Sequence, residues 1–167
     1  MEFSDTVKSL LQNVGWSNNR KVNKINYPID NYPEFVKAFL NNLGMLKIKD
    51  KEYANKYQTY VPSFLNLDPM IGKGEYDSDG YFTYYKSIIQ KELYCLGYYS
   101  PDNYYICCDN DGRVYKIGEY CFCIGNNLYE GIENLLLMNT LQSFQLDEDT
   151  GKWWNMDAEY VEPPPLE

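Results

Sequence analysis

Hydrophobic residues near the start of the chain recur with the spacing of a helix. Between residues 4 and 14 they share one face of an amphipathic helix, at Val7, Leu10, Leu11 and Val14. Ser4 or Asp5 can accept hydrogen bonds from the first amides of this helix, and Gly15 suits the left-handed residue that ends it. Trp16 follows where the chain folds back on the last turn, and we expect it to be a packing anchor.

A second helix is predicted from Pro33 to residue 43. Proline loses nothing in a first turn, and the carboxylate of Glu34 faces the positive end of the helix. Gly44 ends this helix. Its expected buried stripe consists of Phe35, Val36, Phe39, Leu40 and Leu43.

Two later segments also favour helices. Asn126 or Asn127 can cap a helix whose apolar face is Leu128, Ile132, Leu135 and Leu136. Residues 81–91 favour a short helix over a strand, with Tyr85, Ile88 and Ile89 on one side.

The segment from residue 93 to residue 124 has the pattern of consecutive hairpins. Its four runs of aromatic, β-branched and Cys residues (93–99, 104–109, 113–117 and 120–124) are separated by turn-forming residues. We expect Gly112 to hold a positive φ in one of these turns. The sequence therefore predicts a single-domain α+β fold, with a largely antiparallel sheet centred on the 93–124 meander and flanked by helices.

The rest of the chain gives weaker patterns. Short strands are expected at 21–27, 45–49 and 57–61, and residues 66–80 have the breakers of a loop. From residue 142 the composition changes to an acidic segment with a Trp153-Trp154 pair and a proline run. We therefore divide the chain into a domain, 1–141, and an acidic extension, 142–167, whose indoles dock while its end is mobile.

Charge is unevenly distributed along the 167 residues. The net charge is -9; residues 1–60 have nine Lys and Arg against six Asp and Glu, whereas residues 61–167 have six against eighteen. The acidic part repels nucleic acid and attracts basic partners, so we expect no nucleic-acid partner. An alternative is that the acidity only keeps a protein with 18 Tyr in solution.

The sequence shows no segment for a membrane. The N-terminus lacks a basic start followed by an apolar core, and no run approaches the ~18 apolar residues that span a bilayer. We expect a cytoplasmic protein without a membrane partner.

The chain has no His, which removes Ser-His and Cys-His nucleophile pairs and imidazole acid–base chemistry. The five Cys all fall in predicted strands, where reduced thiols behave as small apolar side chains. The alternative is a metal site made of Cys107, Cys108, Cys121 and Cys123. Its spacing is unlike that of zinc knuckles, and adjacent Cys107 and Cys108 would point to opposite faces of a strand.

Two other chemical readings depend on carboxylates. The segment 75–80, EYDSDG, resembles part of a calcium loop, but its closing position falls on Lys86. An enzyme without metal or His would need an acid–base pair among Asp77, Asp79, Asp109 and Asp111. Asp and Asn are common in turns without any ion or substrate, so we expect no enzyme activity, no metal and no cofactor.

Several segments, taken in order, resemble one protein family. They are LLQNVGWSNNRKV (residues 10–22), EFVKAFLNNLGMLKI (34–48), Leu67-Asp68-Pro69, Leu96-Gly97, CDNDGRVY (108–115) and the helix within 125–137. Together they are similar to the SUKH (Smi/Knr-like) superfamily, and most closely to its third group of bacterial immunity proteins. In the matching positions the fold-determining residues are Gly15, Trp16, Gly44, Gly97, Asp109 and Gly112.

The resemblance implies an α+β domain that binds and neutralises a toxin protein, an antitoxin role without catalysis. Many such toxins are nucleases, so the expected partner is a basic toxin, blocked by occlusion. We expect the contact face to include Asp77, Asp79, Tyr98, Tyr99 and Asp102, where Tyr lies beside Asp in or near predicted loops. The alternative is a regulatory scaffold, a role that also occurs in the wider superfamily.

Overall fold

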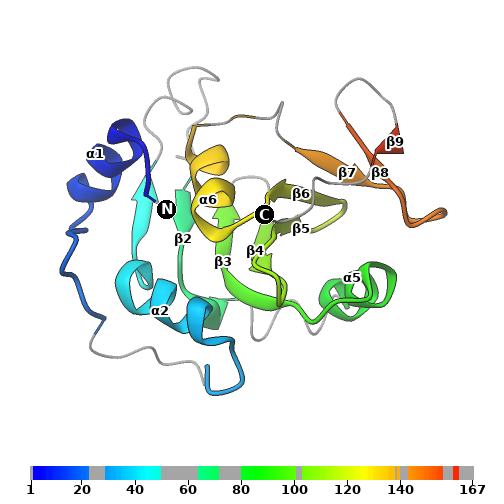
Figure 1. Ribbon diagram of the computed structural model, residues 1–167, viewed down its shortest axis with the longest axis horizontal. Coiled ribbons are helices and arrows are strands. Elements are labelled where there is room, and N and C mark those ends of the chain that lie inside the picture. Colours follow the sequence, from blue (N-terminus) through cyan, green and yellow to red (C-terminus); the bar gives the residue numbers. More distant parts are fainter. Residues whose placement is uncertain are drawn as a thin grey trace.

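A single antiparallel sheet runs through the protein (Figure 1). The computed structural model describes residues 2–22, 29–49, 64–71, 80–100, 103–137, 139, 143–155 and 160–161. Within them nine strands follow one another in chain order, each antiparallel to the next. The strands are β1 Lys47–Lys49, β2 Phe64–Asn66, β3 Tyr94–Ser100, β4 Tyr104–Cys108, β5 Val114–Ile117, β6 Cys121–Gly125, β7 Phe144–Leu146, β8 Trp153–Trp154 and β9 Tyr160–Val161.

The helices form where the apolar periodicity predicts them. They are α1 Asp5–Asn13, α2 Glu34–Leu43, α5 Tyr81–Ile89 and α6 Leu128–Leu136, with a short 3-10 turn at Pro69–Ile71. Ser4 caps α1 by accepting from the Val7 amide, and Asn127 caps α6 by accepting from the Tyr129 and Glu130 amides. The α+β class and the meander are thus confirmed. None of the described helices is long and apolar enough to cross a membrane.

The two faces of the sheet carry two separate cores. Helices α1, α2 and α6 pack mainly Leu, Ile and Val against one face, which we call the aliphatic core. Helix α5 packs on the other face, where Tyr85, Tyr105, Tyr115 and four of the five Cys cluster with Leu146 of β7 and Trp153 of β8; we call this cluster the tyrosine-cysteine core. Figure 1 shows α2 and α6 well separated from α5.

Gly97 marks the place where β2 and β3 approach most closely. The pairing of β3 with β4 shifts between Cys95 and Gly97, as in a β-bulge. A Cβ on Gly97 would lie 2.0 Å from the carbonyl oxygen of Asn66, a distance that no side chain tolerates. Gly97 is therefore required by the backbone of β2, and its fold-determining role is explained.

The turn between β4 and β5 is built around Asp109, which is fully buried. One carboxylate oxygen, Oδ1, accepts from the amides of Asp111 (2.9 Å) and Arg113 (3.0 Å). The other, Oδ2, accepts from the hydroxyl of Tyr115 at 2.8 Å. Gly112 holds the expected positive φ, +91°. The side chain of Asp109 therefore ties this turn to the tyrosine-cysteine core.

The structure corrects one local prediction and adds strands that the sequence pattern does not predict. Phe35 was expected in the buried stripe of α2, but it is 42% exposed, because it lies at the edge of the stripe; a Cβ on Gly112 would be 3.4 Å from its ring. Strand β2 lies in a segment that the sequence pattern leaves unassigned. After residue 142, strands β7 to β9, which the sequence pattern did not predict, continue the sheet. The expected docking of the indoles is confirmed for Trp153, which is 7% exposed and stacks on Tyr115.

Two of the expected strands cannot be fully compared with the structure, because they lie wholly or partly outside the described residues. Lys21 and Val22 are not in a strand, and the rest of the 21–27 segment, like 57–61, lies outside the described residues. The expected strand at 45–49 is present as β1.

Candidate functional site

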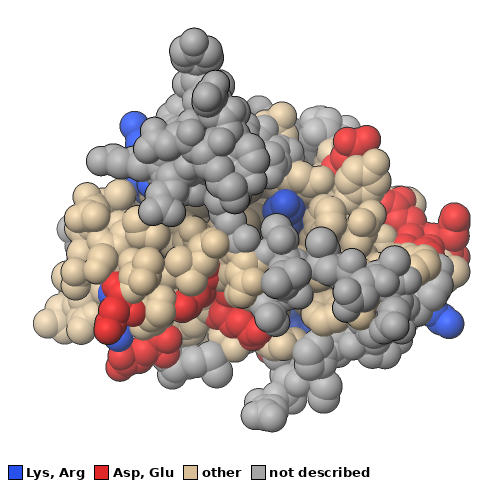
Figure 2. All heavy atoms as spheres, turned by 90° about the horizontal axis from the view of Figure 1, so that it is seen from above, with Lys and Arg blue, Asp and Glu red and all other residues tan. Residues whose placement is uncertain are grey.

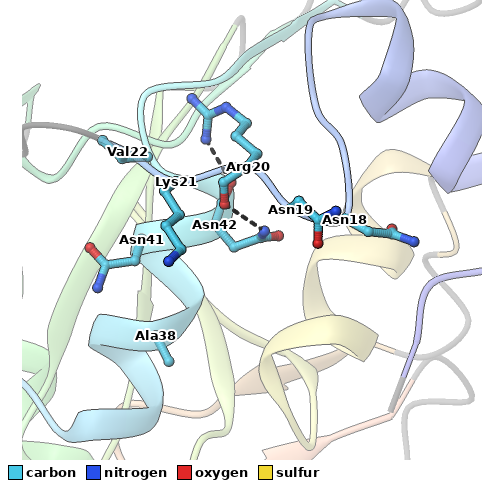
Figure 3. A pocket seen from close by; sticks show the side chains of 8 residues that line it. All are labelled: Asn18, Asn19, Arg20, Lys21, Val22, Ala38, Asn41 and Asn42. Carbon is cyan, nitrogen blue, oxygen red and sulfur yellow. Dashed lines mark hydrogen bonds between the residues drawn. The ribbon is translucent and has the colours of Figure 1, made fainter.

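A pocket of about 760 Å³ lies between the segment after α1 and the C-terminal end of α2. Residues 18–22 line one side, and Ala38, Asn41 and Asn42 line the other (Figure 3). The reversal of the chain at Gly15, whose φ is +93°, turns residues 16–22 back toward α2. The pocket is thus formed by two segments about 20 residues apart in the sequence.

Asn42 holds the two walls of the pocket together. Its Oδ1 accepts from the indole Nε1 of Trp16 at 2.7 Å, and its Nδ2 donates to the carbonyl of Arg20 at 3.1 Å. In return Arg20 Nη1 donates to the Asn42 carbonyl at 2.6 Å. Trp16 is 9% exposed and belongs to the aliphatic core, so its expected role as a packing anchor is confirmed.

The charge at this pocket is opposite to that of the whole protein. Its charged lining residues are Arg20 and Lys21, and its other polar lining side chains are four Asn amides. None of the ion pairs between described residues includes Arg20 or Lys21. The pocket therefore offers hydrogen-bond donors and positive charge, and none of the described residues that line it is a carboxylate.

Acidic side chains gather elsewhere on the surface. Figure 2 shows Asp and Glu atoms on the side where α1 lies in Figure 1 and at the opposite end, near β7 and β8. Near α1, the carboxylate of Glu133 accepts from the Ser4 amide at 3.1 Å, and Lys8 pairs with Glu2 at 2.8 Å. At the other end Asp147, Glu148 and Asp149 share the turn between β7 and β8. The described part of the protein thus has acidic surface at both of these ends.

Glu148 ties the acidic β7–β8 turn to α5. Its Oε2 accepts from the hydroxyl of Tyr84 and its Oε1 from the hydroxyl of Tyr85, both at 2.7 Å. Burial, and then the hydrogen bond to Glu148, raise the pKa of Tyr85 far above its ordinary value. For exposed Tyr84 the hydrogen bond to Glu148 is the main cause of a raised pKa. Both hydroxyls therefore stay protonated and act as donors.

The structure describes two of the five expected contact residues, and it places them on opposite faces of β3. Tyr98 packs at the edge of the tyrosine-cysteine core, partly buried, and its hydroxyl donates to Asn103 Oδ1 at 2.6 Å. Tyr99 belongs to the aliphatic core and is only 6% exposed, which corrects the exposed position expected for it. Neighbouring residues of a strand alternate between faces, so both could not share one surface. Asp77, Asp79 and Asp102 lie outside the described residues.

Two of the four carboxylates considered for catalysis, Asp109 and Asp111, are described, and each is engaged in a structural contact. Both oxygens of Asp109 are used inside the β4–β5 turn, and Asp111 pairs with Lys91. Asp77 and Asp79, with the whole EYDSDG segment, lie outside the described part of the chain. Asp109 and Asp111 thus both have structural partners.

All five thiols are free and buried. Cys108 packs in the aliphatic core and the other four in the tyrosine-cysteine core, so adjacent Cys107 and Cys108 do point to opposite faces. Burial raises the pKa of Cys95 and of Cys123 to about 12. Thiols held protonated are neither nucleophiles nor good metal ligands. Among the described residues, no three Cys, Asp or Glu side chains are grouped as a metal site would need.

Sequence reasoning missed two features of these surfaces. The role of Asn42 was missed, because no sequence pattern distinguishes it from its neighbour Asn41. On the other wall of the pocket, the only signal was the Gly15-Trp16 pair followed by Arg20. The link from Glu148 to α5 joins residues more than 60 apart, for which one sequence gives no signal.

Comparison with protein families gives one match. A family model described as SUKH-3 immunity protein matches residues 3–138. Comparison with curated proteins and with solved structures gives no significant match. The matched range contains the pocket, the meander and α6, and it ends before β7.

Proposed function

The chain belongs to the SUKH-3 immunity protein family, and we propose that it neutralises a basic, nuclease-type toxin by covering the toxin's nucleic-acid-binding surface. Family membership implies immunity to a toxin and a role without catalysis. The toxin's basic character, the occlusion and action in the cytoplasm of the producing cell are the parts that we add.

The uneven charge of the chain carries this proposal. Residues 61–167 have eighteen Asp and Glu against six Lys and Arg. Nucleases bind phosphates with Lys and Arg, so the surface that holds their substrate is positive. An acidic protein is attracted to that surface and competes with nucleic acid for it.

We place the contact face around the 70–84 segment and the β3–β4 turn. Asp77, Asp79 and Asp102 would orient the toxin, and Tyr98 would be the aromatic anchor, since Tyr is often a major contributor to binding. Tyr99, buried in the aliphatic core, would support β3 from within. We also propose that residues 1–141 form the SUKH-like immunity domain and that the 142–167 extension adds partner specificity through its acidic β7–β8 turn.

Coexpression tests this function. The product of the adjacent gene is expressed with and without this protein, and cell survival and copurification of the two chains are measured. We expect survival only with the immunity protein, and a stable complex after purification. Survival without a complex would contradict neutralisation by binding, and a complex that gives no protection would favour the regulatory scaffold.

Competition tests the occlusion. The purified toxin is bound to a fluorescent oligonucleotide under conditions where it does not cleave, and the immunity protein is added. We expect the oligonucleotide to be displaced in proportion to the immunity protein added. A ternary complex that keeps the oligonucleotide bound would overturn the occlusion.

A further inference from the structure

The pocket beside α2 has the chemistry to hold an anion. It is lined by the guanidinium of Arg20, the ammonium of Lys21 and four Asn side chains, and the described part of the chain places no carboxylate in this lining. Figure 3 shows Lys21 extending from its loop toward the turn of α2 that carries Ala38 and Asn41. Positive charge and amide donors on two walls suit a group that accepts several hydrogen bonds at once.

The negative C-terminal end of α2 does not cancel the preference of the pocket for an anion. The last carbonyls of a helix form its negative end and would repel an anion. Here the Asn42 carbonyl accepts from Arg20 Nη1 at 2.6 Å, the Asn41 carbonyl accepts from the Val22 amide at 2.8 Å, and the Leu40 carbonyl accepts from the Gly44 amide at 2.8 Å. Arg20 uses one N–H for this contact, whereas a guanidinium has five. The local carbonyls are thus occupied, and donors remain.

The network around Asn42 fixes the pocket before any partner arrives. Trp16, Arg20 and Asn42 are joined by three side-chain hydrogen bonds between 2.6 and 3.1 Å. Arg20 is half-buried, whereas Lys21 is exposed and can turn toward a ligand. A preformed site loses less conformational freedom on binding than one that must be assembled.

We propose that this pocket receives the carboxylate of an Asp or Glu side chain of the bound toxin. The inference rests on the proposed function and names a second point of contact, opposite in charge to the acidic surfaces. A single carboxylate on a folded partner fits better than a nucleic-acid phosphate, because the net charge of -9 repels a polyanion. A basic toxin that docks on acidic surfaces and places one acid in this pocket is held in one orientation.

The test compares two matched charge reversals. Lys21→Glu changes the pocket, whereas Lys49→Glu makes the same change at an exposed residue at the end of β1 that does not line the pocket and belongs to none of the ion pairs described. Both side chains are exposed, so both variants should melt at the parent temperature. Binding to the product of the adjacent gene is measured by surface plasmon resonance at 0.15 M salt.

We expect Lys21→Glu to raise the dissociation constant about tenfold, mainly through faster dissociation. Lys49→Glu should leave it within about threefold of the parent value. Each Asp and Glu of the toxin is then changed to Lys, and one of these changes should restore binding to Lys21→Glu while weakening binding to the parent. If Lys21→Glu and Lys49→Glu change the dissociation constant equally, or if no change in the toxin restores binding to Lys21→Glu, this inference is overturned while the proposed function stands. No binding by the parent protein would overturn the proposed function and the inference with it.

Discussion

The aliphatic core and the tyrosine-cysteine core stabilise the same sheet in different ways. The aliphatic core buries side chains that need no partner, such as Val7, Leu40 and Ile132. In the tyrosine-cysteine core, buried hydroxyls must be paired: Tyr115 donates to Asp109, and Tyr85 donates to Glu148, with the Glu119 carbonyl also 3.1 Å from the Tyr85 hydroxyl. The difference indicates that one face is stabilised mainly by apolar burial, whereas the other depends on paired hydroxyls and holds four of the five buried thiols.

The largest loss is expected in the aliphatic core. Leu40 is fully buried between α2 and the sheet, and Leu40→Ala should lower the free energy of unfolding by about 4 kcal/mol, because it removes buried methyl groups and leaves a cavity. Urea unfolding at pH 7 and pH 9.5 measures it. The loss should be the same at both pH values, and a loss that changes with pH would contradict the assignment of pH dependence to the other core.

The next largest loss is expected at Asp109. Asp109→Ala removes the acceptor of two part-buried amides and of the buried Tyr115 hydroxyl and leaves these donors without it, which should cost about 3 kcal/mol. Asp109→Asn is the matched control, since it keeps one carbonyl oxygen as an acceptor and should cost less. If both variants unfold at the parent urea concentration, the carboxylate does not support this turn.

A substitution at Gly112 tests the same β4–β5 turn. Gly112 faces Phe35 of α2. At a φ of +91° a β-branched residue is strained, so Gly112→Val should destabilise by about 2 kcal/mol. Thermal melting measures the loss. A melting temperature within error of the parent would show that the turn does not need this conformation.

At neutral pH the smallest expected effect is at a thiol of the tyrosine-cysteine core, where the change appears as a pH slope of stability. Thiols of the unfolded chain ionise near pH 8.5, whereas burial raises the pKa of folded Cys95 to about 12. Between these values the folded state binds more protons, so stability is fully present below pH 8.5 and falls as pH rises toward 12. Cys95→Ala should make this slope shallower by up to about 1.4 kcal/mol per pH unit.

Urea unfolding at steps between pH 7 and pH 10.5 measures the slope. Leu40→Ala is the control, because it lowers stability without removing a titrating group. A slope for Cys95→Ala equal to that of the parent would mean that the thiol ionises with the same pKa in both states.

The parts of the fold that the sequence predicts are those determined by residues close together in the chain. The stripes of α1 and α6, the capping by Ser4 and Asn127 and the four strands of the meander follow from neighbours within a few residues. Strands β2, β7, β8 and β9 have only two or three residues, too few to show alternation, and they form because the sheet already offers an edge.

The candidate site could be predicted only in part. Alternation along β3 already implies that Tyr98 and Tyr99 point to opposite faces, so a contact face with both was not consistent with the expected strand. The pocket could not be predicted, because it depends on the contact between Trp16 and Asn42, which are 26 positions apart in the chain. The Gly15-Trp16 pair signals only that the chain turns there.

The salt dependence of toxin binding decides whether this protein recognises its partner by charge. Association of the cognate toxin is followed by surface plasmon resonance from low salt to 0.5 M salt, with the parent and with a variant in which Asp77, Asp79 and Asp102 are all changed to Asn. Exposed charges more than ~8 Å apart are largely screened at physiological ionic strength, so the association rate should fall steeply as salt rises. The triple variant should associate more slowly at low salt and depend less on salt. Association that is independent of salt and unchanged in the variant would contradict recognition through the acidic face.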